Sequence, residues 1–265
     1  MKNKKLIFSI LTILIIFYSF MIEPNRLIVK NVTVKDSELA GMRVVLVGDY
    51  HIEPNQRKRL KRLVNLINEQ NADLVLSVGD FVAGCEQDTT MPIEDIVKEL
   101  KEVKSKNGFY TVLGNHDCWI DRVGITKELN ENGIRVLSNS NIKVNIKGKE
   151  LYIAGLEDLA TGSPNISQAI DKTKRPVILL THSPDVFPYV PQSVNITLAG
   201  HVHGGQVRLP LFGVLYVPSA YGNRYSQGLI IENGKKMYVT KGIGNSTLSV
   251  RFNCVPEINV IDFES

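Results

Sequence analysis

Five short apolar runs, each followed by polar residues, constrain the fold of this chain more than any other feature of its sequence. The runs are "VVLVGDYH" (44–51), "DLVLSVGDF" (73–81), "YTVLGNHD" (110–117), "VILLTHSP" (177–184) and "ITLAGHVHGG" (196–205). Four of them contain all five histidines of the chain, and the remaining run carries Asp80 after a glycine. Aliphatic and β-branched runs of about four to eight residues with turn residues at their ends are typical of buried strands. The sequence therefore predicts five strands whose ends deliver one cluster of polar side chains.

Two segments with the period of an α-helix separate the first three runs. Their apolar residues fall on one helical face in each segment, and they are Leu60, Leu63, Val64 and Ile67, then Ile93, Ile96, Val97 and Leu100. An alternation of strands and helices is typical of a sheet covered by helices. In such α/β sheets the ligand site lies beyond the carboxyl ends of the strands, so residues as distant in sequence as Asp49 and His203 can meet there.

The second half of the chain is richer in short strands. The predicted strands are "IKVNI", "LYIAGL", "PVILLTH", "VNITLAGH", "QVRLP", "GVLYV", "GLIIE" and "KMYVTKG", several of them joined by turn signals such as "NIKGKE" and "ENGKK". An α/β half followed by a strand-rich half predicts two mixed sheets that pack face to face with helices outside them. The expected fold is therefore of the α/β class, a four-layer α/β/β/α sandwich.

The N-terminus carries an apolar run of a different kind. Residues 6–22, "LIFSILTILIIFYSFMI", contain no charge and would extend about 26 Å as a helix, which is the short limit for crossing a bilayer. A cleaved signal peptide has a similar layout, but its apolar core is shorter and ends in small residues. A buried helix of a soluble fold would need a polar face, which this run lacks. We therefore expect residues 1–22 to be an N-terminal transmembrane anchor, residues 23–36 a linker and residues 37–265 one globular domain.

Charge and cysteine content limit the classes of partner. Basic residues flank the apolar run on both sides, so the rule that cytoplasmic flanks are basic leaves the membrane side open, and we expect an extracytoplasmic domain. The formal net charge is +4, and without the three lysines before the apolar run 28 basic residues face 27 acidic ones. This balance gives no support for a nucleic-acid surface. Cys85, Cys118 and Cys254 are too widely spaced to indicate a disulfide framework or a zinc knuckle.

The polar residues at the strand ends have the chemistry of metal ligands. They are Asp49, His51, Asp80, Asn115, His116, Asp117, His182, His201 and His203. Carboxylate, amide oxygen and imidazole together suit divalent ions such as Mn²⁺, Zn²⁺ or Fe²⁺, with Mg²⁺ also possible, whereas a structural zinc site would use thiolates. The set exceeds the needs of one ion, and an aspartate between two ions would give the two-metal clamp used to hydrolyse phosphate esters.

The ordered blocks "GDYH", "GDFV", "GNHD", "THSPD" and "AGHVHGGQ" resemble the five motif blocks of the calcineurin-like metallophosphoesterase superfamily. The resemblance covers residues 43–263. Within it, "GHVHGGQVRLP" and the C-terminal "VTKGIGNSTLSVRFNCVPEINVI" are similar to the membrane-anchored branch of YkuE-like and YaeI-like bacterial phosphoesterases. That branch in turn resembles the UDP-2,3-diacylglucosamine pyrophosphatases of lipid A synthesis. One departure is Gly48, which stands where the first block usually has serine.

The resemblance implies a role for each polar residue. The implied ligands are Asp49, His51 and His203 for one ion, Asn115, His182 and His201 for the other, and Asp80 as the bridge between the two ions. His116 would be the catalytic residue that stabilises the phosphoryl oxygens or protonates the leaving group. Asp117 would then hold the His116 imidazole in the required tautomer.

The expected activity is hydrolysis of a phosphodiester or pyrophosphate bond, in a lipid-linked or nucleotide-sugar-lipid substrate of the kind that UDP-2,3-diacylglucosamine hydrolases use. A phosphomonoesterase or nuclease on the same metals is the alternative enzyme, because the ligands do not encode the leaving group. The alternative of another class is a non-catalytic metal-binding scaffold. We expect a membrane and a phosphoester substrate as partners, and no nucleic acid.

Several further residues have two interpretations each. A basic run in "NQRKRLKRL" is either a solvated helix face or a surface for anionic lipid headgroups or substrate phosphates, and its members are Arg57, Lys58, Arg59, Lys61 and Arg62. Tyr50 lies either in the core or in the pocket. Trp119 is either a core residue or a stacking surface. Asn245 and Arg251 lie in a stretch that could form a loop over the site.

Overall fold

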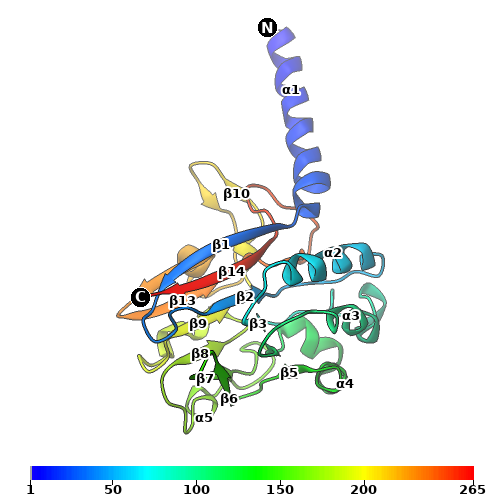
Figure 1. Cartoon of the computed structure of the whole chain (residues 1–265). Helices are drawn as coiled ribbons and strands as arrows, with labels where there is room; N and C mark the ends of the chain where they lie inside the picture. The colour runs from blue at the N-terminus through cyan, green and yellow to red at the C-terminus, as the bar shows by residue number, and fades with distance from the viewer. Residues whose placement is uncertain (1) are drawn as a thin grey trace.

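A projecting N-terminal helix and a two-sheet domain make up the molecule (Figure 1). The structure, a computed structural model, describes residues 2–265, with side chains from Lys4 onward. Helix α1 (Lys2–Phe17) continues through a π-helical turn, η1 (Tyr18–Ile22), and a 3₁₀ turn, η2 (Glu23–Asn25). The helical segment Lys4–Asn25 is long and apolar enough to cross a membrane, and its side chains are largely exposed.

Two six-stranded mixed sheets form the centre of the domain. The first sheet has the order β1 (Ile28–Lys35), β14 (Glu257–Glu264), β2 (Arg43–Val47), β3 (Leu74–Ser77), β4 (Phe109–Thr111) and β5 (Ile134–Val136). All its neighbours are parallel except β14 and β2. The second sheet has the order β12 (Gly228–Glu232), β13 (Lys235–Val239), β9 (Ile196–Ala199), β8 (Val177–Leu180), β7 (Lys149–Gly155) and β6 (Ser140–Ile146). Strands β13, β9, β8 and β7 are parallel, and a hairpin lies at each edge.

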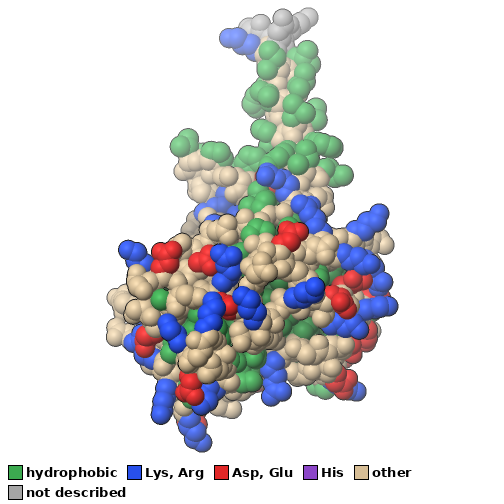
Figure 2. Space-filling view, viewed as in Figure 1, with side chains coloured by type: hydrophobic (Ala, Val, Ile, Leu, Met, Phe, Trp, Pro, Cys, Tyr) green, Lys and Arg blue, Asp and Glu red, His purple; other side chains and the backbone are tan. Residues whose placement is uncertain are grey.

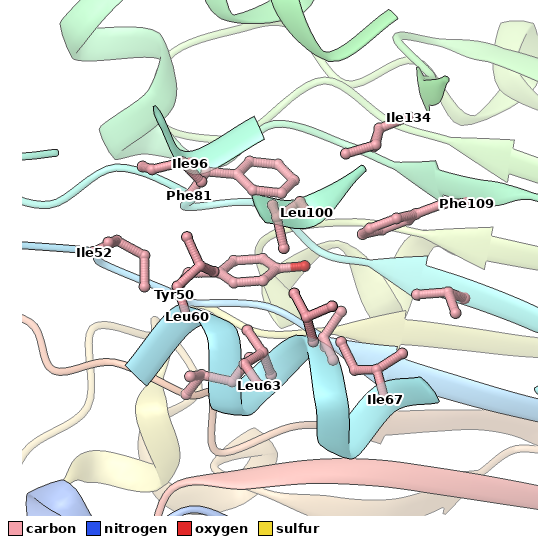
Figure 3. Close-up of a cluster of buried hydrophobic side chains, with 14 of the residues drawn as sticks. Tyr50, Ile52, Leu60, Leu63, Ile67, Phe81, Ile96, Leu100, Phe109 and Ile134 are labelled. Atoms are coloured by element: carbon pink, nitrogen blue, oxygen red, sulfur yellow. The ribbon is translucent and has the colours of Figure 1, made fainter. Parts of the chain in front are cut away.

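Helices α2 (Arg57–Asn68), α3 (Ile93–Leu100) and α4 (Asn115–Glu131) cover the outer face of the first sheet. The predicted apolar faces of the first two helices are confirmed, because Leu60 and Leu63 of α2 and Ile96 and Leu100 of α3 are buried in one cluster with the sheet (Figure 3). Tyr50 belongs to the same cluster, where its ring stacks on Phe81 at 4.7 Å between centroids. Tyr50 is therefore a core residue.

A second apolar cluster fills the space between the two sheets, with residues such as Val44 and Leu76 from one sheet and Ile153 and Leu198 from the other. The outer face of the second sheet is covered by short elements, which are α5 (Ile166–Ala169), η4 (Pro184–Tyr189), η6 (Gly222–Tyr225) and the small hairpin of β10 (Arg208–Leu209) and β11 (Gly213–Val214). Two further 3₁₀ turns are η3 (Gln87–Thr89) and η5 (His203–Gly205). The predicted four-layer sandwich is confirmed, and its fourth layer is thin.

The expected linker does not match the structure. Residues 28–35 form β1, which pairs in parallel with β14 along its whole length, from Ile28 beside Glu257 to Lys35 beside Glu264. Polar and apolar residues alternate along "NVTVK", the second half of this strand, because one face of the edge strand is solvated. Glu23 and Pro24 are also buried, so the globular domain extends well before residue 37.

Candidate dinuclear metal site

The predicted polar residues meet at one edge of the molecule. Asp49 and His51 follow β2, Asp80 follows β3, Asn115 and His116 begin α4 after β4, His182 follows β8, and His201 and His203 follow β9. All of these strands run in the same direction within their sheets, so their carboxyl ends lie together. Because the two sheets pack face to face, the histidines at the ends of β8 and β9 lie next to the aspartates at the ends of β2 and β3.

The backbone at these residues is unusual. Left-handed φ angles occur at Asp49 (49°), His51 (42°), Asp80 (56°), His201 (70°) and His203 (50°). Such angles are uncommon for residues other than glycine, and they persist only where the surrounding structure imposes them. At each of these residues the left-handed backbone turns the side chain out of the strand direction and toward the other proposed ligands.

Three side chains converge on a first point. The Nε2 atoms of His51 and His203 are 3.0 Å apart, and the Nε2 atom of His203 lies 4.0 Å from Oδ1 of Asp49. Asp49, His51 and His203 can together present one ligand atom each to a single ion. At this distance one neutral imidazole can donate a hydrogen bond to the other, or both nitrogens can face one cation.

A second group surrounds Asp80. Its Oδ2 atom lies 3.2 Å from Nε2 of His182 and 3.5 Å from Nε2 of His51, so it faces both groups. Nε2 of His182 is 3.1 Å from Oδ1 of Asn115 and 3.1 Å from Nδ1 of His201. Asp80 is thus placed between the two sets of side chains.

Burial shifts the pKa values of the charged groups in this cluster. All of the seven predicted ligands except His201 are buried. Burial raises the pKa of Asp49 to about 7 and lowers that of His51 to about 3 and that of His201 to about 4. His182 differs, because the Asp80 carboxylate outweighs burial and raises its pKa to about 10. The neutral imidazoles of His51 and His201 have the protonation state that metal binding requires.

The surroundings of the cluster fit metal ions in two ways. Oδ2 of Asp49 is buried without a hydrogen-bond partner in the described part of the chain, and a bound cation would satisfy it. Glycines line the site closely: a Cβ atom on Gly114 would lie 2.1 Å from Oδ1 of Asp80, and one on Gly200 would lie 2.7 Å from Oδ2 of Asp49. The donor set of carboxylates, imidazoles and one amide oxygen therefore suits divalent ions.

His116 lies beside the cluster, but Asp117 does not orient it. The ring of His116 packs edge-on against His51 at 4.6 Å, and its Nδ1 atom contacts the carbonyl oxygen of Gly84. The expected pairing of Asp117 with His116 is therefore wrong. The Asp117 carboxylate instead accepts hydrogen bonds from the backbone N–H groups of Asp80, Phe81, Val82 and Gly114. Its role is to hold the loop that carries Asp80.

A cavity of about 590 Å³ opens over the cluster, with His116 and His201 in its floor. Trp119 lies in its wall, half exposed and 4.9 Å from the His116 ring, so it is not a core residue. Another part of the wall comes from the segment directly after the β10–β11 hairpin, which includes Leu215 and Tyr216. Sequence reasoning does not identify this wall as part of the site, because its side chains are not of the types that bind metals or transfer protons.

Arg251 and the basic run have structural contacts. The guanidinium of Arg251 is fully buried and donates to the carbonyl oxygens of Lys241, Gly244 and Cys254. From the basic run, Arg57 pairs with Asp95, and Arg59 donates to the carbonyl oxygens of Pro24 and Ile243. The contacts of Arg59 hold the base of α1 and those of Arg251 hold the C-terminal loop, so neither of these two arginines is free to bind a substrate phosphate.

Comparisons with known proteins agree with this site. The sequence pattern of the calcineurin-like phosphoesterase family matches residues 42–205, which is more than half of the chain. The metallophosphoesterase YkuE of Bacillus subtilis (strain 168) is 29% identical over 94% of this chain and 89% of its own length. The phosphodiesterase YaeI of Escherichia coli (strain K12) is 30% identical over 73% of this chain and 71% of its own length.

A third relative carries a membrane description in its name. The "Transmembrane protein with metallophosphoesterase domain" of Danio rerio is 30% identical over 84% of this chain, and the match spans about half, 53%, of that protein. Two of these three relatives are named as metallophosphoesterases and the third as a phosphodiesterase. The chain belongs to the calcineurin-like phosphoesterase family and is a metal-dependent hydrolase of phosphoric esters.

Proposed function

We propose that this protein is a membrane-anchored phosphodiesterase or pyrophosphatase that uses two divalent metal ions. The observation that supports this proposal most directly is the position of Asp80 between two groups of buried ligands. In the proposed assignment, one ion is held by Asp49, His51 and His203, the other by Asn115, His182 and His201, and Asp80 serves both. The donor atoms favour Mn²⁺, Zn²⁺ or Fe²⁺, with Mg²⁺ as a further possibility.

When bound, two such ions supply Lewis acidity that activates water and neutralises charge on a phosphoryl group. The side chain of His116 adds a proton donor at the cavity floor. A carbonyl oxygen can only accept, so the contact with Gly84 places a proton on Nδ1 of His116 and leaves Nε2 for the substrate. In its protonated form, His116 would donate from Nε2 to a phosphoryl oxygen or to the leaving oxygen.

The lipid-linked part of the proposal rests on position. The candidate transmembrane segment Lys4–Asn25 leads directly into the domain, and we propose that it anchors the protein with the domain on the extracytoplasmic side. The relative from Danio rerio supports the anchor by its name. A phosphodiester or pyrophosphate in a lipid-linked molecule is the substrate class that an anchored enzyme meets at the bilayer, and UDP-2,3-diacylglucosamine is an example of that class.

The first experiment measures metal content and hydrolysis by the full chain in detergent micelles. Because β1 belongs to the sheet, a fragment starting at residue 37 would lack one of its strands. We expect two ions per chain with Mn²⁺ or Zn²⁺, and turnover of bis-p-nitrophenyl phosphate. His201→Ala should lose both metal and turnover. Bound metal without turnover on a diester, a pyrophosphate or a monoester would contradict the proposal and favour a metal-binding scaffold.

A substrate panel then separates the enzymatic alternatives. A rate on p-nitrophenyl phosphate that exceeds the rate on diesters would identify a phosphomonoesterase. Cleavage of DNA or RNA in preference to small diesters would identify a nuclease. Faster turnover of a pyrophosphate-linked lipid than of its water-soluble analogue is the result that the proposed function predicts.

A further inference from the structure

The hairpin formed by β10 and β11 and the two residues directly after it expose a group of large apolar side chains. Leu211 is fully exposed at its tip, and the exposed fractions are 80% for Phe212, 65% for Leu215 and 74% for Tyr216. Leu248, from the neighbouring C-terminal loop, is 61% exposed. Single exposed apolar residues are normal on a soluble protein, but an adjoining group of this size marks an interaction surface. We call these five side chains the apolar lip.

The apolar lip lies at the end of the domain from which α1 projects. The hairpin, yellow in Figure 1, rises toward the same end as the blue helix, and hydrophobic side chains cover both in the space-filling view (Figures 1 and 2). Hydrogen bonds connect the two regions through one loop. The backbone N–H of Arg251 donates to the carbonyl oxygen of Ser19 in η1 at 2.9 Å, and the N–H of Phe252 donates to that of Gln206 at 2.9 Å.

The base of α1 is fixed to the domain rather than joined by a loose tether. The Glu23 carboxylate accepts the backbone N–H of Cys254, and the Arg59 guanidinium donates to the carbonyl oxygen of Pro24 at 3.0 Å. Glu23 and Pro24 are both buried. A bilayer that contains α1 must therefore lie at this end of the domain, next to the apolar lip.

Three of the five side chains of the apolar lip also line the cavity over the metal-ligand cluster. Leu215, Tyr216 and Leu248 line the cavity whose floor contains His116 and His201. The strands of the hairpin are paired, Arg208 with Val214 and Leu209 with Gly213, so only the three tip residues between them need the water and headgroups of the interfacial layer for their backbone groups. An exposed tyrosine beside aliphatic residues is typical of a membrane interface.

We propose that the apolar lip inserts into the interfacial layer of the bilayer that holds α1, so that the catalytic cavity opens at the lipid surface. The occupant of this surface is the membrane itself. This inference rests on the proposed membrane anchor, and it goes beyond the anchor because it gives the domain a fixed orientation. A phosphoester attached to a lipid would then reach His116 without leaving the bilayer surface.

Fluorescence quenching by brominated lipid tests the insertion directly. The native tryptophan is removed by Trp119→Phe, and Phe212→Trp is then introduced into the full chain in phosphatidylcholine vesicles. The matched control is Val123→Trp on the same background, because Val123 is 77% exposed on α4, at the opposite end of the domain from α1 in Figure 1. Brominated phosphatidylcholine should cause a loss of emission from the Phe212→Trp protein and none from the Val123→Trp protein.

Flotation of the same vesicles separates the failure of this inference from the failure of the anchor. If the protein floats with the vesicles but the Phe212→Trp protein is quenched no more than the control, the proposed insertion of the apolar lip is overturned and the proposed anchor is not. Protein that does not float would overturn both. Leu211→Asp combined with Phe212→Asp gives a second measurement, because it should slow hydrolysis of a diester embedded in vesicles more than hydrolysis of bis-p-nitrophenyl phosphate, whereas Val123→Asp should slow neither selectively. An equal loss on the two substrates would count against the apolar lip.

Discussion

The two ends of the first sheet each bury an aspartate, and the two aspartates differ in the charged partners that they have. At the amino end of β3, Asp73 accepts the backbone N–H of Arg43 at 2.9 Å and pairs with Lys147 at 2.7 Å and Lys106 at 3.3 Å. At the carboxyl end of β2, Asp49 accepts one backbone N–H, from His201, and its Oδ2 atom has no partner among the described residues.

The pKa values follow the partners. Burial opposes ionisation at both positions, but the lysines and the backbone N–H lower the pKa of Asp73, whereas burial raises that of Asp49 to about 7. A buried carboxylate stabilises the fold when both of its oxygens have partners, and a buried carboxylate with an unpartnered oxygen is a candidate for function. Substitutions at the two ends should therefore separate stability from activity.

The largest effect is expected from Gly114→Ala at the carboxyl end. The added Cβ atom would lie 2.1 Å from Oδ1 of Asp80 and would displace the proposed bridging ligand. We expect hydrolysis to fall to background and metal content to fall below two ions per chain, measured by mass spectrometry of the metals. Gly133→Ala is the matched control, because nothing lies within 4 Å of its Cβ position and its φ of 82° costs only stability, about 1–2 kcal/mol. Full activity in the Gly114→Ala protein would remove Asp80 from the proposed centre.

His116→Ala should give the next largest effect. Loss of a positioned proton donor lowers kcat by about 10²–10⁴-fold, and the metal content should stay the same. His116 also lies within reach of the ligand atoms of His51 and Asp80, so it could instead bind metal. Metal analysis of the variant decides between the two roles: a loss of one ion would make His116 a ligand.

Asp73→Ala should change stability and leave the chemistry of the other end intact. The substitution removes the acceptor of a partly buried backbone N–H and of two lysines, which we expect to cost about 1–3 kcal/mol of unfolding free energy. Asp262→Ala is the matched control, since its pairing with Arg43 is partly exposed and worth at most about 1 kcal/mol. Chemical denaturation measures both, and equal losses in the two variants would show that burial of Asp73 contributes nothing extra.

The smallest expected effect is the pH dependence of the stability that Asp73→Ala loses relative to wild type. The pKa of Asp73 is lowered below its ordinary value of 3.8 in the folded state, so its contribution is complete above pH 3.8 and is lost as the pH falls through the folded pKa. The gap in Tm between wild type and Asp73→Ala, measured with a chelator present, should be constant near neutral pH and should narrow below about pH 3.8. A gap that widens in acid would reverse the sign assigned to this group.

The sequence was most informative about the carboxyl end of the strands. Each proposed ligand follows an apolar run and is one of three residue types, and those two signals are local, so Asp49 and His203 could be found without knowing how the sheets pack. The helical faces of α2 and α3 could be predicted for the same reason, because the period of the apolar residues is visible within a dozen positions.

The parts that could not be predicted depend on residues far apart in the chain. Read alone, residues 28–35 resemble a linker because their partner strand, β14, lies far away in the sequence. Proximity in sequence pairs Asp117 with its neighbour His116, whereas the closely spaced N–H groups that fix it come from the loop after β3. The sequence does not indicate helix α4, since Gly124 lies within it and Asp121 interrupts its backbone geometry. The apolar lip has no sequence signal, because only its exposure in the folded protein distinguishes it.

The place of β14 in the first sheet has a consequence for biosynthesis. β14 follows all the other described strands in the sequence, yet it lies between β1 and β2, which precede the rest. β1 therefore leaves the ribosome early, whereas its neighbour in the sheet is made only after every other strand. The first sheet cannot be completed until β14 has been synthesised, and β1 has no strand to pair with until then. A ribosome that stalls before residue 257 would leave the first sheet open between β1 and β2, which makes synthesis of the eight residues of β14 the step that commits the domain to its folded state.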